Sequence, residues 1–335
     1  MILAVDAFNL ATDRRGMGRY VRSILSGMRA LGQNNIRLVV RSRHKAQGLE
    51  REFDLPVMEP RDMRSRRAGV VWYPWNGMRF DPDAPSIVTI YDPFAFTFPH
   101  TNFIARLREQ KPIRRAVRKA DAIVTISEWS AGELRRMFGI DARRLAIVPP
   151  ALEPFWHPVP PPRETEYVLF VAGPEKRKNA SLLFEAFEDA FEGGRVELIV
   201  AGALNARDRG SLRKMCARKQ HVMPSDQELR TLYSGALAVA VPSLAEGYGL
   251  PVIEAMACGA PVIASSASAL PEAAAAAALL VAPDDRTAWS TALQRLAAGP
   301  KLRAELRIAG LARIAAIDPF APARNLLEIA RKLTA

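Results

Sequence analysis

Short runs of consecutive apolar residues, many of them β-branched, alternate with helix-length stretches along the whole chain. A run without polar alternation marks a strand buried on both faces, which is typical of parallel sheets covered by helices. The expected strands are residues 2–8, 36–40, 69–73, 86–91 and 122–127 in the first half, and 167–172, 196–201, 236–241, 261–265 and 278–281 in the second. The pattern therefore predicts two doubly wound α/β domains.

A proline-rich stretch separates these two series of strands. Residues 149–166, PPALEPFWHPVPPPRETE, contain seven prolines, which can continue neither a helix nor an interior strand. We therefore expect a linker here. The predicted division is a first domain at 1–155, a second at 156–317 and a final helical segment at 318–335.

Composition excludes several classes of protein. Of the 335 residues, 49% are hydrophobic and 24% are charged, which rules out a disordered or collagen-like chain. No apolar run reaches the roughly 18 residues that a membrane-spanning helix needs. Two cysteines are too few for a disulfide framework or a structural zinc site. We expect a protein of the reducing cytoplasm.

The formal net charge of +12 is unevenly distributed. Residues 1–160 hold 26 Lys and Arg against 16 Asp and Glu, a net +10, whereas residues 161–335 hold 21 against 19, a net +2. A basic first half predicts a negatively charged partner: nucleic acid, an anionic membrane surface or a phosphate-bearing substrate.

The basic stretch 106–119, RLREQKPIRRAVRK, narrows the choice of partner. Together with apolar neighbours it forms an amphipathic surface, expected to break at Pro112, that suits an anionic membrane. The alternative is a helix whose apolar side packs on its own sheet, and both can hold because the cations stay free. Nucleic acid is disfavoured, since the charges lack interleaved aromatic residues.

The densest chemical signal is the loop Glu246-Gly-Tyr-Gly-Leu-Pro-Val-Ile-Glu254, which follows an expected strand and opens a short helix. Such a loop directs backbone N–H groups and a helix N-terminus at the carboxyl edge of the sheet, which makes a phosphate site. Gly247 and Gly249 admit close approach of a ligand. Glu246 and Glu254 either accept hydrogen bonds from sugar hydroxyls or are acids that favour the helix dipole.

A cationic turn, residues 173–179 (GPEKRKN), lies between another expected strand and helix. Arg177 and Lys178 suit a diphosphate there, with Asn179 as the expected helix N-cap; a solvated charge run is the alternative. A glycine loop, residues 14–20 (RRGMGRY), follows the first strand but lacks the third glycine of the dinucleotide fingerprint.

The stretch EGYGLPVIEAMACGAPVIAS resembles the E-x7-E signature of the family 4 retaining glycosyltransferases, which have the GT-B fold of two facing Rossmann-like domains with a cleft between them. GPEKRKNASLLFEAF, RGMGRYVRSIL, AIVTISEWSAGEL and SALPEAAAAAALLVAPDD resemble further segments of that family. The resemblance implies that the first domain binds the acceptor and the second a nucleoside-diphosphate sugar. It also implies that the last helix crosses back to the first domain.

The resemblance assigns roles to the glycine-rich loop of the second domain. Glu254 would hold the ribose hydroxyls of the nucleotide, and Glu246 would touch the donor sugar. The backbone around Tyr248, Gly249 and Leu250 would meet sugar and phosphate.

Further roles follow from the other segments. Arg177 and Lys178 would bind the diphosphate and stabilise charge on the leaving group, and Gly18 would lie across the cleft near the same phosphates. Such enzymes need neither metal nor cofactor, and the leaving phosphate assists deprotonation of the acceptor. Many relatives carry a histidine where this chain has Tyr91, which makes Asp92 the nearest candidate for an acceptor-side base; a turn residue at a strand end is the alternative.

We therefore predict a cytoplasmic, retaining, metal-independent hexosyltransferase, with GDP-mannose favoured over UDP-glucose as donor. The basic first domain predicts a lipid-diphosphate-linked saccharide acceptor at the inner membrane face, in polysaccharide or lipopolysaccharide assembly. Two alternatives stay open: a non-catalytic nucleotide-sugar-binding partner subunit, and a nucleotide-sugar epimerase of the same fold.

Overall fold

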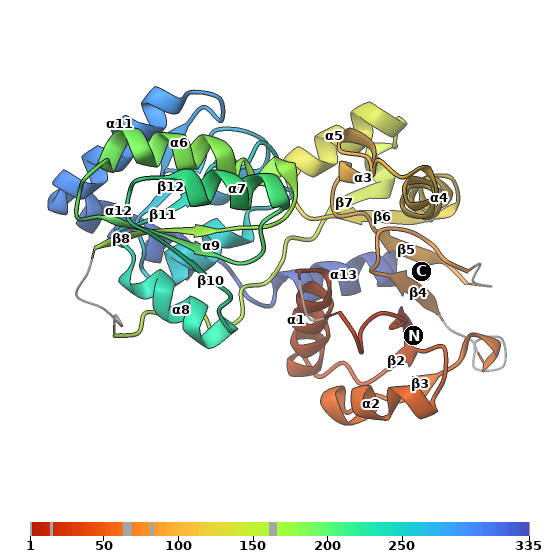
Figure 1. Ribbon diagram of the computed structural model, residues 1–335. Helices are drawn as coiled ribbons and strands as arrows, with labels where there is room; N and C mark the ends of the chain where they lie inside the picture. The colour runs from red at the N-terminus through yellow and green to blue at the C-terminus, as the bar shows by residue number, and fades with distance from the viewer. Residues whose placement is uncertain (1, 14–15, 63–68, 81–83, 161–165, 335) are drawn as a thin grey trace. The chain divides into compact units, whose positions relative to one another are not determined.

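A computed structural model describes residues 2–13, 16–62, 69–80, 84–160 and 166–334. The chain divides into two compact units, Met1–Ala151 with Asp318–Ala335, and Leu152–Ile317. Each unit is built around one parallel β-sheet (Figure 1). The sequence-based division places its breaks after residues 155 and 317.

The first unit holds a sheet in the order β3-β2-β1-β4-β5-β6-β7. Its strands are β1 (Leu3–Asp6), β2 (Ile36–Val39), β3 (Val57–Met58), β4 (Val70–Tyr73), β5 (Ser86–Thr89), β6 (Ala122–Thr125) and β7 (Leu145–Ile147). Its helices are α1 (Gly16–Ala30), α2 (Gln47–Phe53), α3 (Phe94–Thr97), α4 (Phe103–Lys119), α5 (Glu128–Phe138) and α13 (Ala321–Lys332). Short 3₁₀ turns occur at His44–Ala46, Pro60–Asp62 and Ala142–Arg144.

The second unit holds a sheet in the order β10-β9-β8-β11-β12-β13. Its strands are β8 (Tyr167–Val171), β9 (Glu197–Ala201), β10 (Lys219–Val222), β11 (Ala238–Val241), β12 (Val262–Ser265) and β13 (Leu279–Val281). Its helices are α6 (Ala180–Phe191), α7 (Ala206–Lys214), α8 (Asp226–Gly235), α9 (Leu250–Ala257), α10 (Leu270–Ala274), α11 (Arg286–Ala298) and α12 (Pro300–Ala315), with a 3₁₀ turn at Lys176–Lys178.

Both faces of the second sheet are covered, as the continuous apolar runs predict. Along β8, Val168 and Phe170 join one buried cluster with α6, α7 and α11, whereas Tyr167 and Leu169 join another with α8, α9 and α10. Figure 1 shows α6 and α11 on the side of the sheet opposite to α8. Successive strand residues point to opposite faces, so a strand covered on both sides is apolar throughout.

The described residues contain all ten expected strands and three further strands that were not expected: β3, β7 and β10. Each of the three lies at the edge of its sheet. β7 and β10 contain no buried residue, and β3 is two residues long. β10 (KQHV) is largely polar and β3 is too short to form a run, so neither shows the apolar pattern by which the other strands were predicted.

The order of strands reverses once in each sheet. β1 lies between β2 and β4, and β8 lies between β9 and β11. In open α/β sheets, ligands bind outside the carboxyl ends of the strands at such a reversal.

The last helix, α13, packs on α1 within the first unit (Figure 1). Gly27 makes this packing close, because a Cβ atom built on it would lie 3.0 Å from the Cβ of Ala323. Within 149–160, the described part of the proline-rich stretch, there is no helix or strand. Its Trp156 is buried and stacks edge-on against Tyr233 of α8, with ring centroids 5.7 Å apart.

Candidate active site

The glycine-rich loop of the second unit runs from β11 into α9, at the carboxyl edge of the sheet. Gly249 occupies the N-cap position with a φ of +99°, a conformation that favours glycine. Pro251 lies in the first turn, where its missing N–H has no intrahelical partner to lose. The loop therefore turns sharply and presents the start of α9 at the sheet edge, as the sequence predicts.

The end of α9 is equally well defined. Gly259 follows the C-cap with a φ of +75°. Its N–H donates to the carbonyl of Met256 over 3.0 Å, and the N–H of Ala260 donates to the carbonyl of Ala255 over 2.9 Å. These two bonds form a Schellman motif, which confirms the predicted position of Gly259.

Glu246 joins the glycine-rich loop to the cationic turn. Lys178 Nζ donates to Glu246 Oε1 over 2.7 Å, and Arg177 Nη1 donates to Glu246 Oε2 over 3.0 Å. Ser243 Oγ also donates to Oε1, over 2.8 Å. The backbone N–H of Leu244 donates to the carbonyl of Arg177 over 2.7 Å. Two segments almost 70 residues apart in sequence thus form one charged cluster, which is defined here as Arg177, Lys178 and Glu246.

The charges in this cluster support one another. Burial raises the pKa of the Glu246 carboxyl, but attraction to Lys178 and then Arg177, with hydrogen bonds from Lys178 and Ser243, outweighs burial and holds the pKa below its ordinary value. The carboxylate is buried, so its charge is screened little by water. Glu246 therefore stays ionised and holds both cations in place through its ion pairs.

Asn179 lies at the predicted place but does not cap the helix as predicted. It is in the left-handed conformation, with a φ of +57°, and its side chain makes no cap hydrogen bond to α6. Its Nδ2 instead donates to the carbonyls of Pro242, over 3.1 Å, and Pro283, over 2.8 Å. These carbonyls belong to the loops after β11 and β13, so Asn179 ties three loops of the carboxyl edge together.

Glu254 lies about one turn inside α9 and is buried. Its Oε2 accepts a hydrogen bond of 3.2 Å from the hydroxyl of Tyr233, a fully buried residue that the sequence analysis did not single out. Burial, and then the charge of Glu254, raise the pKa of the neighbouring Cys258 thiol to about 12, so that thiol stays protonated. Of the remaining loop residues, Tyr248 and Leu250 are half-buried.

Gly18 was predicted to lie in a loop, but it lies in the first turn of α1, which begins at Gly16. A Cβ atom at Gly18 would lie 2.0 Å from the carbonyl oxygen of Asp13. Glycine is therefore required here so that the chain entering α1 can pack against the helix itself. Arg14 and Arg15 lie outside the described residues, and the role of Gly18 toward a phosphate stays a prediction.

Asp92 behaves as a turn residue in this structure. Its Oδ1 accepts a hydrogen bond of 2.9 Å from the N–H of Phe94, at the start of α3. The adjacent Tyr91 is buried, and its ring stacks edge-on against Tyr20 with centroids 5.1 Å apart. Within the described ranges of the chain, the buried Tyr91 hydroxyl has no hydrogen-bond partner. The predicted catalytic role of Asp92 is not tested by this geometry.

The basic helix α4 is continuous, so the predicted break at Pro112 is wrong. The carbonyl of Pro112 accepts a hydrogen bond of 3.3 Å from the N–H of Met78, which anchors the middle of α4 to the chain after β4. Ile113 and Ala116 are buried, so one side of the helix packs on its own sheet. Near its N-terminus, Phe103 and Ile104 are each 60% exposed.

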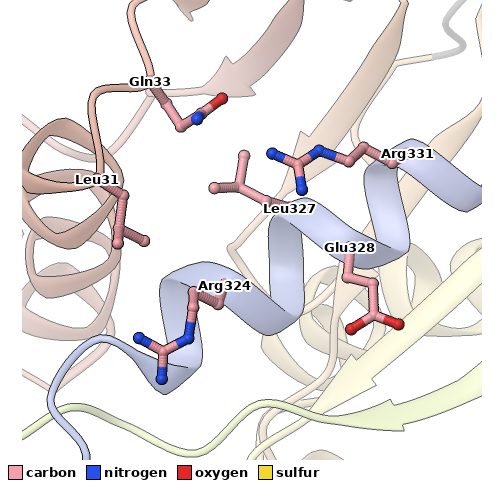
Figure 2. A pocket seen from close by; sticks show the side chains of 6 residues that line it. All are labelled: Leu31, Gln33, Arg324, Leu327, Glu328 and Arg331. Carbon is pink, nitrogen blue, oxygen red and sulfur yellow. The ribbon is translucent and has the colours of Figure 1, made fainter.

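A hollow of about 470 Å³ lies in the first unit between the end of α1 and α13. Figure 2 shows Gln33 and Leu31 on one side and α13 on the other. Its lining residues are Leu31, Gln33, Arg324, Leu327, Glu328 and Arg331, none of which is a predicted site residue.

The described part of the chain holds no group of three or more His, Cys, Asp or Glu side chains placed to bind a metal ion. None of its helices is both long and apolar enough to cross a membrane.

Comparison with known families finds a matching family model for each half of the chain. The family model for glycosyl transferases group 1 matches residues 154–313, and the model for glycosyltransferase family 4 matches residues 14–154. An O-antigen chain mannosyltransferase B from Escherichia coli is 29% identical over 222 residues, which are 60% of this chain and 58% of the relative. The chain thus spans somewhat over half the length of this curated relative.

Solved structures share the fold over the whole chain. WaaG, a glycosyltransferase involved in lipopolysaccharide biosynthesis, matches with a TM-score of 0.73 at 15% identity, over 98% of this chain and 99% of that one. Anabaena Alr3699/HepE in complex with UDP and glucose matches with a TM-score of 0.72 at 13% identity, over 99% of both chains. Together with the two family models, which adjoin at residue 154, these matches show that the chain belongs to the group 1 and family 4 glycosyltransferases and has their GT-B fold.

Proposed function

We propose that this protein is a retaining glycosyltransferase that moves a hexose from a nucleoside-diphosphate sugar to a saccharide acceptor. The observation that carries the proposal is the charged cluster of Arg177, Lys178 and Glu246, which joins the turn between β8 and α6 to the loop before the N-terminus of α9. Two cations and a helix N-terminus at the carboxyl edge of a parallel sheet suit a diphosphate.

The same cluster supplies the chemistry that transfer needs. As the bond between the sugar and the diphosphate breaks, negative charge develops on the departing phosphate oxygen. Arg177 and Lys178 stabilise that charge, because Glu246 has already oriented them and little reorganisation is needed. The leaving phosphate then assists deprotonation of the acceptor hydroxyl, as the family resemblance implies.

We assign to Glu254 the binding of the donor's nucleotide through its ribose hydroxyls. A buried carboxylate fixed by a neighbouring hydroxyl accepts hydrogen bonds from paired ribose hydroxyls in a defined geometry. Glu246, Tyr248, Gly249 and Leu250 are assigned to the donor sugar and its phosphates.

We favour GDP-mannose as the donor and mannose as the transferred sugar. The name of the E. coli relative, which specifies mannosyl transfer, supports this choice. The HepE structure holds UDP and glucose, which keeps UDP-glucose as the second candidate. The acceptor is a lipid-linked saccharide of cell-surface polysaccharide or lipopolysaccharide. WaaG, which has the same fold, is described as a lipopolysaccharide enzyme.

Contact with an anionic membrane is part of this proposal. Exposed apolar side chains lie beside cations around the start of α4: Phe98 is 45%, Phe103 60% and Leu107 46% exposed. Arginine and lysine attract anionic headgroups while apolar side chains insert between them. Sedimentation with phosphatidylglycerol vesicles at low salt is expected to pull down the wild type. Replacing Phe103 and Leu107 with serine is expected to reduce it, and equal sedimentation would contradict this contact.

Transfer itself is tested by incubating the protein with each donor and a set of lipid-linked saccharides, followed by NMR of the product. The expected product carries a new α-linked hexose. An altered donor sugar in the absence of any acceptor would instead identify an epimerase. Donor binding without either product would support the partner-subunit alternative.

A further inference from the structure

Asp6 is a buried carboxylate at a position that invites a ligand. It is the last residue of β1, the strand at which the order of the first sheet reverses. Its side chain is fully buried. Ligands of doubly wound sheets bind outside the carboxyl ends of strands at such a reversal.

Only part of the hydrogen-bonding capacity of Asp6 is used. Its Oδ1 accepts a hydrogen bond of 3.0 Å from the N–H of Phe8, and its backbone carbonyl accepts one of 2.7 Å from the indole of Trp75. Its Oδ2 is buried and has no hydrogen-bond partner among the residues that the structure describes. Leaving a buried acceptor unpaired costs free energy, and such groups are rare unless they have a function.

The surroundings of Asp6 have the chemistry of a saccharide site. The guanidinium of Arg41 lies 5.0 Å from the centre of the Phe8 ring, which lies 5.5 Å from the ring of Phe80. Arg79 and Arg41 both attract the Asp6 carboxylate. Both arginines are exposed and lie beyond strand ends, so their guanidinium groups are open to an anionic group on a ligand. Aromatic faces suit the apolar face of a sugar, carboxylates its hydroxyls and guanidinium groups an attached anion.

We propose that the carboxyl edge around Asp6, Phe8 and Arg41 is an acceptor subsite, in which Asp6 Oδ2 accepts a hydrogen bond from a saccharide hydroxyl and Arg41 with Arg79 faces a phosphate or carboxylate on the same molecule. This inference deepens the proposed function and rests on it for the identity of the saccharide as acceptor. Burial raises the pKa of Asp6 to about 6, so the carboxyl is largely ionised at pH 7.5 and largely protonated at pH 5.

The first experiment needs no turnover. Saturation-transfer NMR at pH 7.5 would use methyl α-D-mannoside as a neutral probe and D-glucuronate as an anionic one. The wild type is expected to bind both, with preference for glucuronate. Asp6→Asn is expected to weaken both at least tenfold, and Arg41→Gln to reduce only the preference, because Arg79 remains. Asp54→Asn is the matched control, because Asp54 is an exposed aspartate that pairs with Arg29 of the same unit.

Thermal melting distinguishes a ligand-binding role of the Asp6 carboxylate from a purely structural one. A carboxylate kept for a ligand at a cost to stability predicts that Asp6→Asn melts higher than wild type at pH 7.5, and that this gain shrinks at pH 5. A purely structural aspartate predicts a lower melting temperature at both. No binding of either probe to the wild type, or equal binding to Asp6→Asn, would overturn the subsite. The proposed function would instead fail if no nucleoside-diphosphate sugar bound.

Discussion

The hydroxyl of Tyr233 donates a hydrogen bond of 3.2 Å to Oε2 of Glu254 and so joins α8 to α9 beneath the glycine-rich loop. Tyr233 is itself fixed, because it is fully buried and stacks edge-on against Trp156. The residue assigned to the ribose is therefore held by a side chain from another helix. Substitutions on α8, outside the glycine-rich loop, should change the affinity for the donor.

Tyr233→Phe is expected to lower donor affinity about tenfold, because a hydrogen bond to a charged group contributes roughly 1.5–3 kcal/mol. The check is titration calorimetry with a nucleoside-diphosphate sugar and with its 2′-deoxyribose analogue. The loss should be smaller for the deoxy analogue if Tyr233 acts through the ribose contact.

Tyr167→Phe is the matched control for this experiment. The Tyr167 hydroxyl donates a hydrogen bond of 2.7 Å to the backbone carbonyl of Leu232, which is not a predicted site residue. Its removal should reduce stability with donor affinity unchanged. Equal donor affinity in wild type and Tyr233→Phe would show that Tyr233 does not position Glu254.

Glu246→Gln is expected to reduce stability at pH 7 by up to about 3 kcal/mol, since it leaves two largely buried cations without their carboxylate. The pKa of Glu246 is lower in the folded chain than its ordinary 4.5, so its contribution is complete above that value and is lost as the pH falls through the folded pKa. Denaturant unfolding from pH 7 to pH 3 should therefore show a shallower decline for Glu246→Gln.

The comparison for that series is Glu133→Gln, which breaks an ion pair with Arg136 on the surface of α5. Exposed pairs of this kind contribute little, so this variant should stay close to wild type at pH 7. Parallel pH curves for wild type and Glu246→Gln would mean that Glu246 is not the ionised centre of the cluster.

Asn179→Gly is expected to cost about 1–3 kcal/mol, because it keeps the left-handed backbone but removes both hydrogen bonds to the carbonyls of Pro242 and Pro283. Asn179→Asp should cost more, since a carboxylate then faces two carbonyl oxygens. Melting temperatures of the two variants give the measurement. A melting temperature for Asn179→Asp at or above that of Asn179→Gly would refute the role of Nδ2 as a donor to both carbonyls.

Gly249→Ala is expected to destabilise the chain by about 1–3 kcal/mol and to weaken donor binding. A Cβ there would lie 3.0 Å from Leu270 Cδ2 and 3.1 Å from Ala273 Cβ, at a φ that strains any L side chain. Gly210→Ala offers the opposite case, since Gly210 lies inside α7 with nothing within 4 Å of an added Cβ. It should gain about 0.5–1 kcal/mol. Similar melting temperatures for the two variants would contradict this account of the loop.

The inner strands and the glycine positions could be predicted because each depends on local physics. A strand covered on both faces must be apolar throughout, and a helix that ends in a Schellman motif favours glycine at position 259. The ion pairs of Glu246 with Arg177 and Lys178 were not predicted, because spacing in sequence alone does not bring together segments almost 70 residues apart.

Other features could not be predicted because they depend on tertiary packing. The amide of Asn179 reaches carbonyls in two distant loops instead of the helix it precedes. Helix α4 continues through Pro112, whose carbonyl is anchored by Met78. Asp6, in contrast, could have been singled out from the sequence, because it is a charged residue at the end of an apolar run.

Thermal melting with a panel of GDP-, UDP-, dTDP- and ADP-sugars, without added metal, tests the central claim most directly. At 100 times its dissociation constant, a ligand stabilises the folded chain by about 2.7 kcal/mol. We predict that one nucleotide shifts the wild type and that Glu254→Ala, whose affinity should fall about 10- to 100-fold, shows a clearly smaller shift at the same concentration. No shift with any donor, or the same shift in Glu254→Ala, would contradict the donor site described here.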